Sequence, residues 1–149
     1  MKIEEIIKSE NITLSKKVIL NLLYSQSKLN ETLYVGLKPF DMSTEQFNVL
    51  RILRGQKGLP INMCDIQDRM IAKTSNTTRL VDKLLKKDLV TRNICKNNRR
   101  KMEVLITQKG LELLSILDPL VLAYEEHFTN NLNEEELNTL NTLLEKFIS

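Results

Sequence analysis

Apolar residues along most of the chain recur at intervals of three and four, and this spacing predicts helices. The longest runs over residues 13–37 and is closed by Gly36 and Pro39. Another long helix is predicted over residues 108–127. Because Pro119 lies inside it, we expect a kink or a break just before the proline.

Residues that cap helices precede the shorter apolar stripes. Ser43 with Gln46, and Asn133 with Glu136, have the spacing of a capping box. A helix over residues 74–87 is expected to begin at Thr74. The remaining predicted caps are Asn62, before a brief helix, and Thr107, before the second long one.

Two runs of alternating apolar and polar residues, 89–95 and 101–107, predict a pair of strands. The turn between them contains Asn97 and Asn98, and asparagine tolerates the positive φ that tight turns need. A hairpin with cations at its tip is therefore predicted after residue 89.

The brief helix after Asn62 and the helix over residues 74–87, joined by a short turn, form a helix-turn-helix. In that arrangement the second helix enters the DNA major groove, and the hairpin serves as a wing at the minor groove, over about residues 95–101. We expect a mainly α fold with a small β-hairpin wing in a single chain, 1–149. The winged helix-turn-helix spans 42–109, and helical dimerisation segments span 1–38 and 110–149.

Composition adds a strong segregation of charge to this picture. The net charge is only +3, but residues 73–109 hold 11 Lys and Arg against three acids, giving +8 there and −5 elsewhere. This distribution is typical of a module that binds a polyanion. The leucine-rich stripes of the terminal segments exceed what a small central domain can cover, so burial between two copies is expected.

Three stretches make the chain similar to the MarR family (multiple antibiotic resistance regulators). They are MSTEQFNVLRILR at 42–54, KTSNTTRLVDKLLKKDLV at 73–90 and NNRRKMEVLITQKG at 97–110. The resemblance covers about residues 15–147. It implies a symmetric homodimer whose two winged domains bind a pseudo-palindromic double-stranded DNA operator, usually as a repressor. Many members release DNA in response to a small aromatic effector or an oxidant.

The recognition helix and the wing supply the predicted contacts to DNA. Base contacts are expected from Ser75, Asn76, Thr78 and Arg79, because arginine pairs with guanine, asparagine with adenine, and hydroxyls with either strand. Wing contacts are expected from Arg99 and Arg100, and phosphate contacts from Lys83, Lys86 and Lys96. An ion pair with Asp82 or Asp68 is the alternative for Arg79.

The sequence departs from the family pattern at two positions. Asn98 stands where an acid usually precedes the paired arginines, which implies a looser or less selective wing. Asp88 stands after the recognition helix where the family tends to have glycine, and aspartate occupies such a position at some strain.

The cysteines, the single histidine and the aromatic residues give weak evidence for a metal, redox or effector site. Cys64 and Cys95 have no zinc-binding spacing, and Cys95, among basic residues, is the better candidate for an oxidant-sensing thiol. His127 is expected to be a helix-end cation, so neither a metal nor a cofactor is predicted. The aromatic residues in the segments that would line an effector crevice, more often core than ligand contacts, are Tyr24, Tyr34, Phe40 and Phe47.

Two other classes of protein compete with a DNA-binding regulator. An enzyme would need a nucleophile with its base, a carboxylate cluster or a metal site, and the sequence offers none. A winged-helix interaction module that binds a protein or RNA is the closer rival, although the basic helix and wing argue against it. No apolar run is long enough to span a membrane and the N-terminus lacks a signal peptide, so a cytoplasmic protein is expected.

Overall fold

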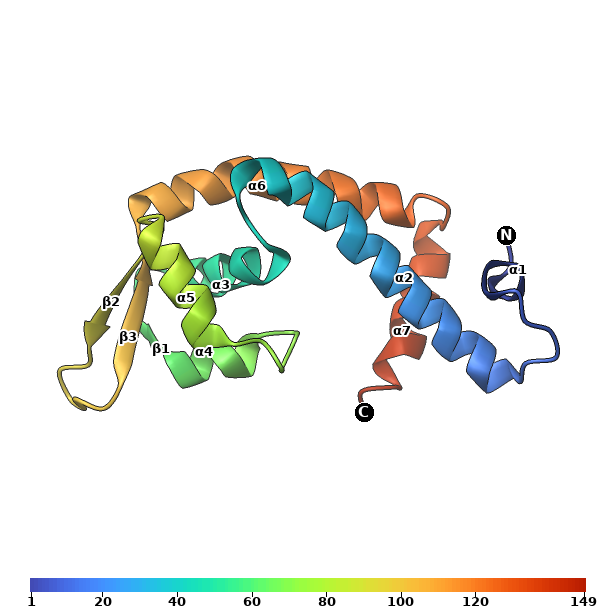
Figure 1. Ribbon diagram of the computed structural model, residues 1–149, viewed down its shortest axis with the longest axis horizontal. Helices are drawn as coiled ribbons and strands as arrows, with labels where there is room; N and C mark the ends of the chain where they lie inside the picture. Colours follow the sequence, from blue (N-terminus) through green and yellow to red (C-terminus); the bar gives the residue numbers. More distant parts are fainter.

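The computed structural model describes all residues from 1 to 149 (Figure 1). In chain order the elements are α1 (Ile3–Ile7), α2 (Leu14–Leu37), the 3₁₀ helix η1 (Lys38–Phe40), α3 (Thr44–Gly55), β1 (Ile61–Asn62), α4 (Met63–Arg69), α5 (Thr77–Lys86), β2 (Val90–Ile94), β3 (Met102–Ile106), α6 (Gln108–Thr129) and α7 (Glu134–Glu145). The mainly helical fold with a small wing is confirmed.

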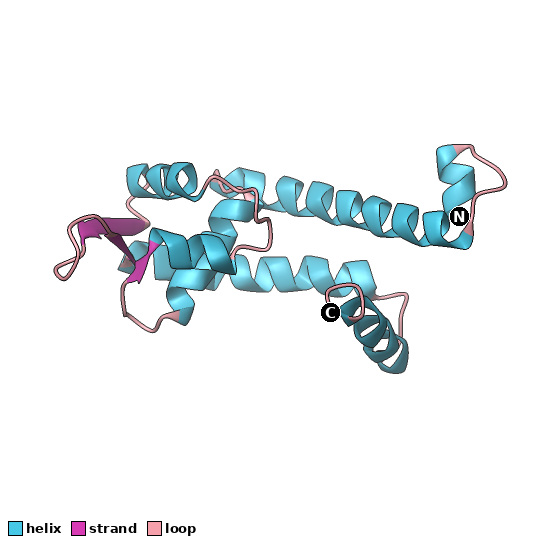
Figure 2. Ribbon diagram, turned by 90° about the horizontal axis from the view of Figure 1, so that it is seen from below, coloured by secondary structure: helices cyan, strands magenta, loops and turns pink.

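The elements form two regions that lie at opposite ends of the molecule (Figures 1 and 2). The winged region, residues 41–107, contains α3, α4, α5 and the three strands. The terminal helices α1, α2, α6 and α7 form the helical region, and both chain termini lie in the half away from the wing (Figure 1). The long helices α2 and α6 pack against each other and extend from the winged region.

One hydrophobic cluster of 17 buried residues holds the winged region together. All of its members lie between residues 42 and 104 except Leu37, Leu114, Leu117 and Val121, which come from α2 and α6. The apolar stripes of the three short helices contribute Phe47, Leu50, Leu53, Ile66, Met70, Val81 and Leu84 to it. The helical stripes read from the sequence therefore meet in a common core.

The sheet has one strand more than the predicted hairpin. Its order is β1-β3-β2, and both pairs are antiparallel. Val90 lies opposite Ile106 and Ile61 opposite Val104, so the short segment before α4 completes the sheet. The loop between β2 and β3 is seven residues long, from Cys95 to Lys101, and contains no residue with positive φ. The prediction that its asparagines adopt such a conformation is therefore wrong, because the longer loop turns without it.

Gly36 and Pro119 act differently from the sequence-based expectation. Helix α2 ends at Leu37, as predicted, but Gly36 lies buried in its last turn, where a Cβ would overlap the Tyr124 ring on α6. The glycine thus permits the close crossing of the two long helices. Helix α6 starts at its predicted cap, Thr107, and continues through Pro119 without a break, with a bow that is visible in Figure 1.

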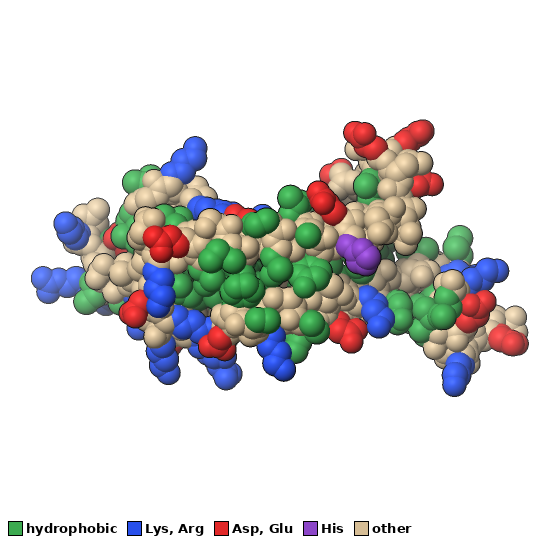
Figure 3. Space-filling view, turned by 90° about the horizontal axis from the view of Figure 1, so that it is seen from above, with side chains coloured by type: hydrophobic (Ala, Val, Ile, Leu, Met, Phe, Trp, Pro, Cys, Tyr) green, Lys and Arg blue, Asp and Glu red, His purple; other side chains and the backbone are tan.

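The helical region leaves many large apolar side chains on the surface. Helix α7 begins with the predicted Asn133–Glu136 capping box but buries none of its residues. An open apolar hollow of about 900 Å³ lies between α2, the end of α6 and α7. Apolar side chains also form a band along the face over α2 and α6 in Figure 3. No helix combines the length and apolar character required to cross a membrane.

Candidate nucleic-acid interface

Helices α4 and α5 form the predicted helix-turn-helix, but the second helix starts later than expected. Its N-cap is Asn76, whose side-chain Oδ1 accepts the Arg79 N–H at 3.1 Å. Thr74 lies in the turn before the helix, so the prediction that it caps α5 is wrong. Asparagine is among the strongest capping residues, and its position here is set by how the turn packs on α4.

Gln67 and Thr77 fasten the turn, and neither was identified from the sequence. The Thr77 hydroxyl donates a hydrogen bond to Gln67 Oε1, and Gln67 Nε2 donates to the backbone oxygen of Lys73 at 2.6 Å. Thr77 is buried at the same face of α5 as Val81 and Leu84. Its spacing of four residues from Val81 is the signal that could have placed it in the core.

The outer face of α5 presents the residues predicted to contact DNA. Those exposed to solvent are Asn76, Thr78, Arg79, Lys83 and Lys86, while Ser75 is half-buried in the turn. Asp82 pairs with Arg92 of β2 at 2.7 Å, and Asp68 accepts a hydrogen bond from Lys73 through its backbone oxygen. The guanidinium of Arg79 makes no hydrogen bond or ion pair, so the alternative partners considered for it are not used.

The wing carries a second set of cations beside α5. Arg99, Arg100 and Lys96 are exposed in the loop between β2 and β3, and none pairs with an acid. Asn98, at the position where an acid was noted as missing, accepts the Arg100 backbone N–H at 3.1 Å. The pair between Arg92 and Asp82 links the wing strand to the recognition helix.

The charge of segment 73–109 divides into internal and free cations. Four of its 11 bases make bonds inside the protein: Lys73, Lys87, Arg92 and Lys109. The free ones are Arg79, Lys83, Lys86, Lys96, Arg99, Arg100 and Lys101. These seven belong to α5 and the wing loop, and Figure 3 shows Lys and Arg gathered at that end of the molecule. The concentration of unpaired cations on one helix and one loop suits a polyanion.

The end of α5 shows the departure noted from the sequence. Asp88 has φ 59°, the left-handed conformation that favours glycine. The Leu89 N–H donates to the Leu84 oxygen at 3.1 Å, which closes the helix C-terminus. Aspartate therefore takes the position where glycine was expected.

The remaining candidate groups do not converge on a site. Cys64 is exposed and Cys95 is half-buried, and a role in oxidant sensing stays a prediction. His127 is exposed in the last turn of α6, and no three His, Cys, Asp or Glu side chains gather as a metal site would need. Phe47 is buried in the core and Tyr34 is exposed. The small aromatic effector stays a prediction.

Comparisons with known proteins agree on one family. The family model described as MarR family matches residues 42–102. The HTH-type transcriptional regulator MhqR of Bacillus subtilis is 26% identical, covering 89% of this chain and 90% of that protein. The structure of a MarR transcription factor from Planctomyces limnophilus is 30% identical with a TM-score of 0.72, covering 91% of this chain and 98% of that one. A mutant MarR from E. coli, solved in complex with operator DNA, is 25% identical with a TM-score of 0.79, covering 93% and 100%.

Proposed function

This chain belongs to the MarR family of transcription regulators, and we propose that it binds a pseudo-palindromic operator as a homodimer and acts as a repressor. Helix α5 enters the major groove, and the loop from Cys95 to Lys101 reaches the minor groove. The observation that carries this proposal is the set of seven unpaired cations on α5 and the wing loop.

The recognition helix divides its contacts by residue type. Arg79 has a free guanidinium at the first turn of α5, and arginine forms a bidentate pair with guanine. Ser75, Asn76 and Thr78 lie near the same helix end and contact neighbouring bases. Asn76 uses one lone pair of its Oδ1 for the helix cap, which leaves its second lone pair and its NH₂ group for adenine. Lys83, Lys86 and Lys96 contact phosphates, and Arg99 and Arg100 enter the minor groove.

Dimerisation follows from the uncovered apolar surface of the helical region. The hollow between α2, α6 and α7 is lined mainly by apolar side chains such as Leu22, Leu140 and Leu143. An amphipathic helix such as α7 obtains most of its stability from burying its apolar face. The same helices of a second copy supply that cover and place two recognition helices on one side, as a palindromic site requires.

Fluorescence anisotropy on a labelled duplex from the gene's own upstream region tests the proposal, with a random duplex as the reference. Arg79→Ala should cost about 1–3 kcal/mol on the operator and relax sequence preference. Lys86→Ala should weaken both duplexes equally and reduce the dependence of log affinity on log salt by about 0.9. Arg99→Ala combined with Arg100→Ala should remove most of the preference for the operator.

Equal effects of Arg79→Ala and Lys86→Ala on both duplexes would contradict base recognition by Arg79. Equal, weak binding of the unaltered protein to operator and random DNA would contradict the proposed function. A contact with an apolar protein partner would lack the steep salt dependence. The relatives described above are transcription regulators, so they give no support to the alternative of a protein- or RNA-binding module.

A further inference from the structure

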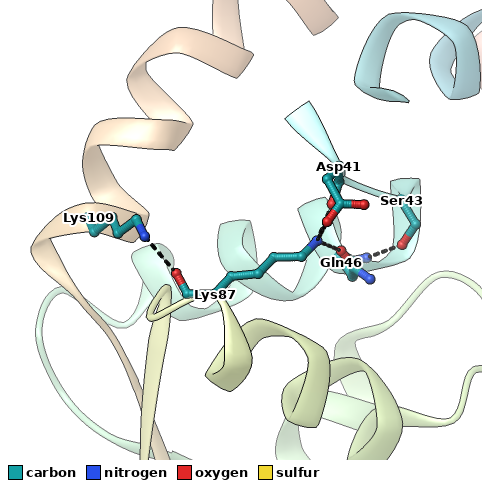
Figure 4. Close-up of polar contacts among 5 residues, drawn as sticks. All are labelled: Asp41, Ser43, Gln46, Lys87 and Lys109. Carbon is teal, nitrogen blue, oxygen red and sulfur yellow. Dashed lines mark hydrogen bonds and ion pairs between the residues drawn. The ribbon is translucent and has the colours of Figure 1, made fainter. Parts of the chain in front are cut away.

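Lys87, at the C-terminal end of α5, contacts both chain segments that join the winged region to the helical region. One segment follows α2 and runs from η1 into the first turn of α3, up to Gln46. The other is the start of α6, at residues 107–110. The side chain of Lys87 bonds to the first segment and its backbone oxygen to the second (Figure 4).

The ammonium group of Lys87 is held at the junction between α2 and α3. It donates hydrogen bonds to the backbone oxygen of Asp41 and to Gln46 Oε1, the latter at 3.0 Å, and lies 3.4 Å from Asp41 Oδ2. Two of the three N–H donors of the ammonium group are used in these hydrogen bonds, and the Asp41 carboxylate adds an ion pair. The side chain is only 25% exposed, so this lysine, unlike its neighbour Lys86, is not available to phosphate.

Gln46 explains why this contact is specific. Its backbone N–H is capped by Ser43 Oγ at 3.1 Å, as half of the predicted capping box. The other half is absent, because the amide oxygen accepts from Lys87 and does not reach back to Ser43. Gln46 is 5% exposed, so without Lys87 its oxygen would lose its donor in a nearly dry position.

The second segment meets Lys87 from the opposite side. Lys109 Nζ donates to the Lys87 backbone oxygen at 3.0 Å, and Thr107 Oγ1 donates to the Asp88 oxygen at 2.7 Å. The last carbonyls of a helix have no partner within it, and here the first turn of α6 provides one. The end of the recognition helix is thus bonded to the first turn of α6 and, through Asp41 and Gln46, to the segment that follows α2.

On the basis of the proposed function, we propose that Lys87 is a positioning residue that sets the angle between the winged region and the dimer, and so selects the spacing of operator half-sites. Inserting one base pair between half-sites moves them apart by about 3.4 Å and rotates them by roughly 36°. A junction held by two hydrogen bonds and an ion pair resists the change of angle that the inserted base pair requires. A junction without these bonds would adopt the new angle at little cost in free energy.

The test uses the full-length protein and three duplexes: the operator, the operator with one inserted base pair, and a single half-site. Lys87→Met should keep half-site affinity within about twofold but lose about tenfold on the operator, because a second winged region held less firmly to the dimer has a lower effective concentration at its half-site. The ratio of its affinity for the operator to its affinity for the duplex with one inserted base pair should fall to near one. The slope of log affinity against log salt should not change. Lys87→Arg, which keeps the cation, should restore the preference. Lys86→Met, the matched control, should lower the salt slope by about 0.9 and keep the preference.

Three results would overturn the assignment. A salt slope that falls in Lys87→Met as in Lys86→Met would make Lys87 a phosphate contact. Equal losses on half-site and operator would make its role local to the folding of α5. An unchanged spacing preference would leave it without a role in recognition.

A measurement without DNA separates this proposal from the proposed function. Spin labels at Asn30→Cys on α2 and Lys83→Cys on α5, in a chain carrying Cys64→Ser and Cys95→Ser and diluted with unlabelled chain, report the distance between the two regions by double electron–electron resonance. Lys87→Met should broaden the distance distribution and Lys86→Met should not. If operator binding fails but the broadening occurs, only the proposed function is wrong. If operator binding holds and the width is unchanged, Lys87 does not fix the junction.

Discussion

In the winged region most large apolar side chains lie inside one core, whereas the terminal helices leave many of theirs exposed. The large apolar residues exposed in the winged region are Leu59, Ile71 and Ile94. On α7 alone, Leu140, Leu143 and Leu144 are exposed, and the helix has no buried residue. The winged region is therefore complete within one chain, while the helical region is half of a structure that a second chain finishes.

The largest effect is expected from a charge in the uncovered hollow. Leu143 is 50% exposed and lines it. Leu143→Glu should weaken dimerisation by about a thousandfold, because each of two copies loses roughly 2 kcal/mol of apolar burial. Sedimentation velocity over a range of concentrations measures this. Leu59→Glu, at a residue 69% exposed in the winged region, is the control and should leave the dimer intact. An unaffected dimer in Leu143→Glu would show that the second copy does not cover α7.

A substitution in the buried core should lower the stability of the fold and leave dimerisation unchanged. Leu84 is fully buried on α5, and Leu84→Ala should lower the free energy of unfolding by about 2–5 kcal/mol. Urea denaturation followed by circular dichroism gives this value. The dimer dissociation constant of the folded variant should change little. Loosening of the dimer to the extent expected for Leu143→Glu would contradict the independence of the two regions.

The close crossing of α2 and α6 offers a smaller test within the helical region. Gly36→Ala should cost about 1–3 kcal/mol, because the new methyl group overlaps the Tyr124 ring, which must then shift from its place against α2. Gly55→Ala is the matched control, since nothing lies within 4 Å of a Cβ there. It should change the free energy of unfolding by less than about 1 kcal/mol. Thermal unfolding of both variants measures these changes. Equal effects of the two substitutions would show that the crossing is not tight.

The smallest effect concerns α1, which packs on α2 with Ile3 buried. A hydrogen bond from Lys17 lowers the pKa of Glu4 from its ordinary value. The contribution of the Glu4 carboxylate to the stability of the folded state is therefore present above the unfolded-state pKa. It is lost as pH falls through the lowered folded-state pKa. The protection factors of the α1 amides, which correct for the intrinsic pH dependence of exchange, should fall on such acidification, while those of the winged region should not change. Glu4→Gln should abolish this pH dependence, and its persistence there would assign it to another group.

The order of elements and the inward faces could be predicted from the sequence, because periodicity reports which side of a helix is apolar. The start of α5 could not. Thr74 and Asn76 both have capping side chains, and the choice depends on the contact of Thr77 with Gln67 on another helix. The second hydrogen bond of the predicted Ser43 capping box is absent for a similar reason. The Gln46 side chain bonds instead to Lys87, which lies 41 residues away in the sequence.

The arginines proposed for the interface are available to a ligand, whereas the charge of the basic segment includes cations that are not. Arg79, Arg99 and Arg100 are exposed and unpaired, which fits the contacts proposed for them. Lys87 and Lys109 were counted in the same basic segment, yet their ammonium groups bond within the protein. A sequence gives the charge of a lysine but not the direction of its long side chain.

The capping role of Asn76 limits how this regulator can change its operator during evolution. A residue at that position must both accept the Arg79 N–H and tolerate a base edge. Serine and threonine meet both demands, aspartate would repel phosphate, and most other residues would cost about 1 kcal/mol of helix stability. Thr78 and Arg79 carry no such duty, so paralogues that diverge in DNA preference should vary first at these two positions and keep a short polar residue at position 76.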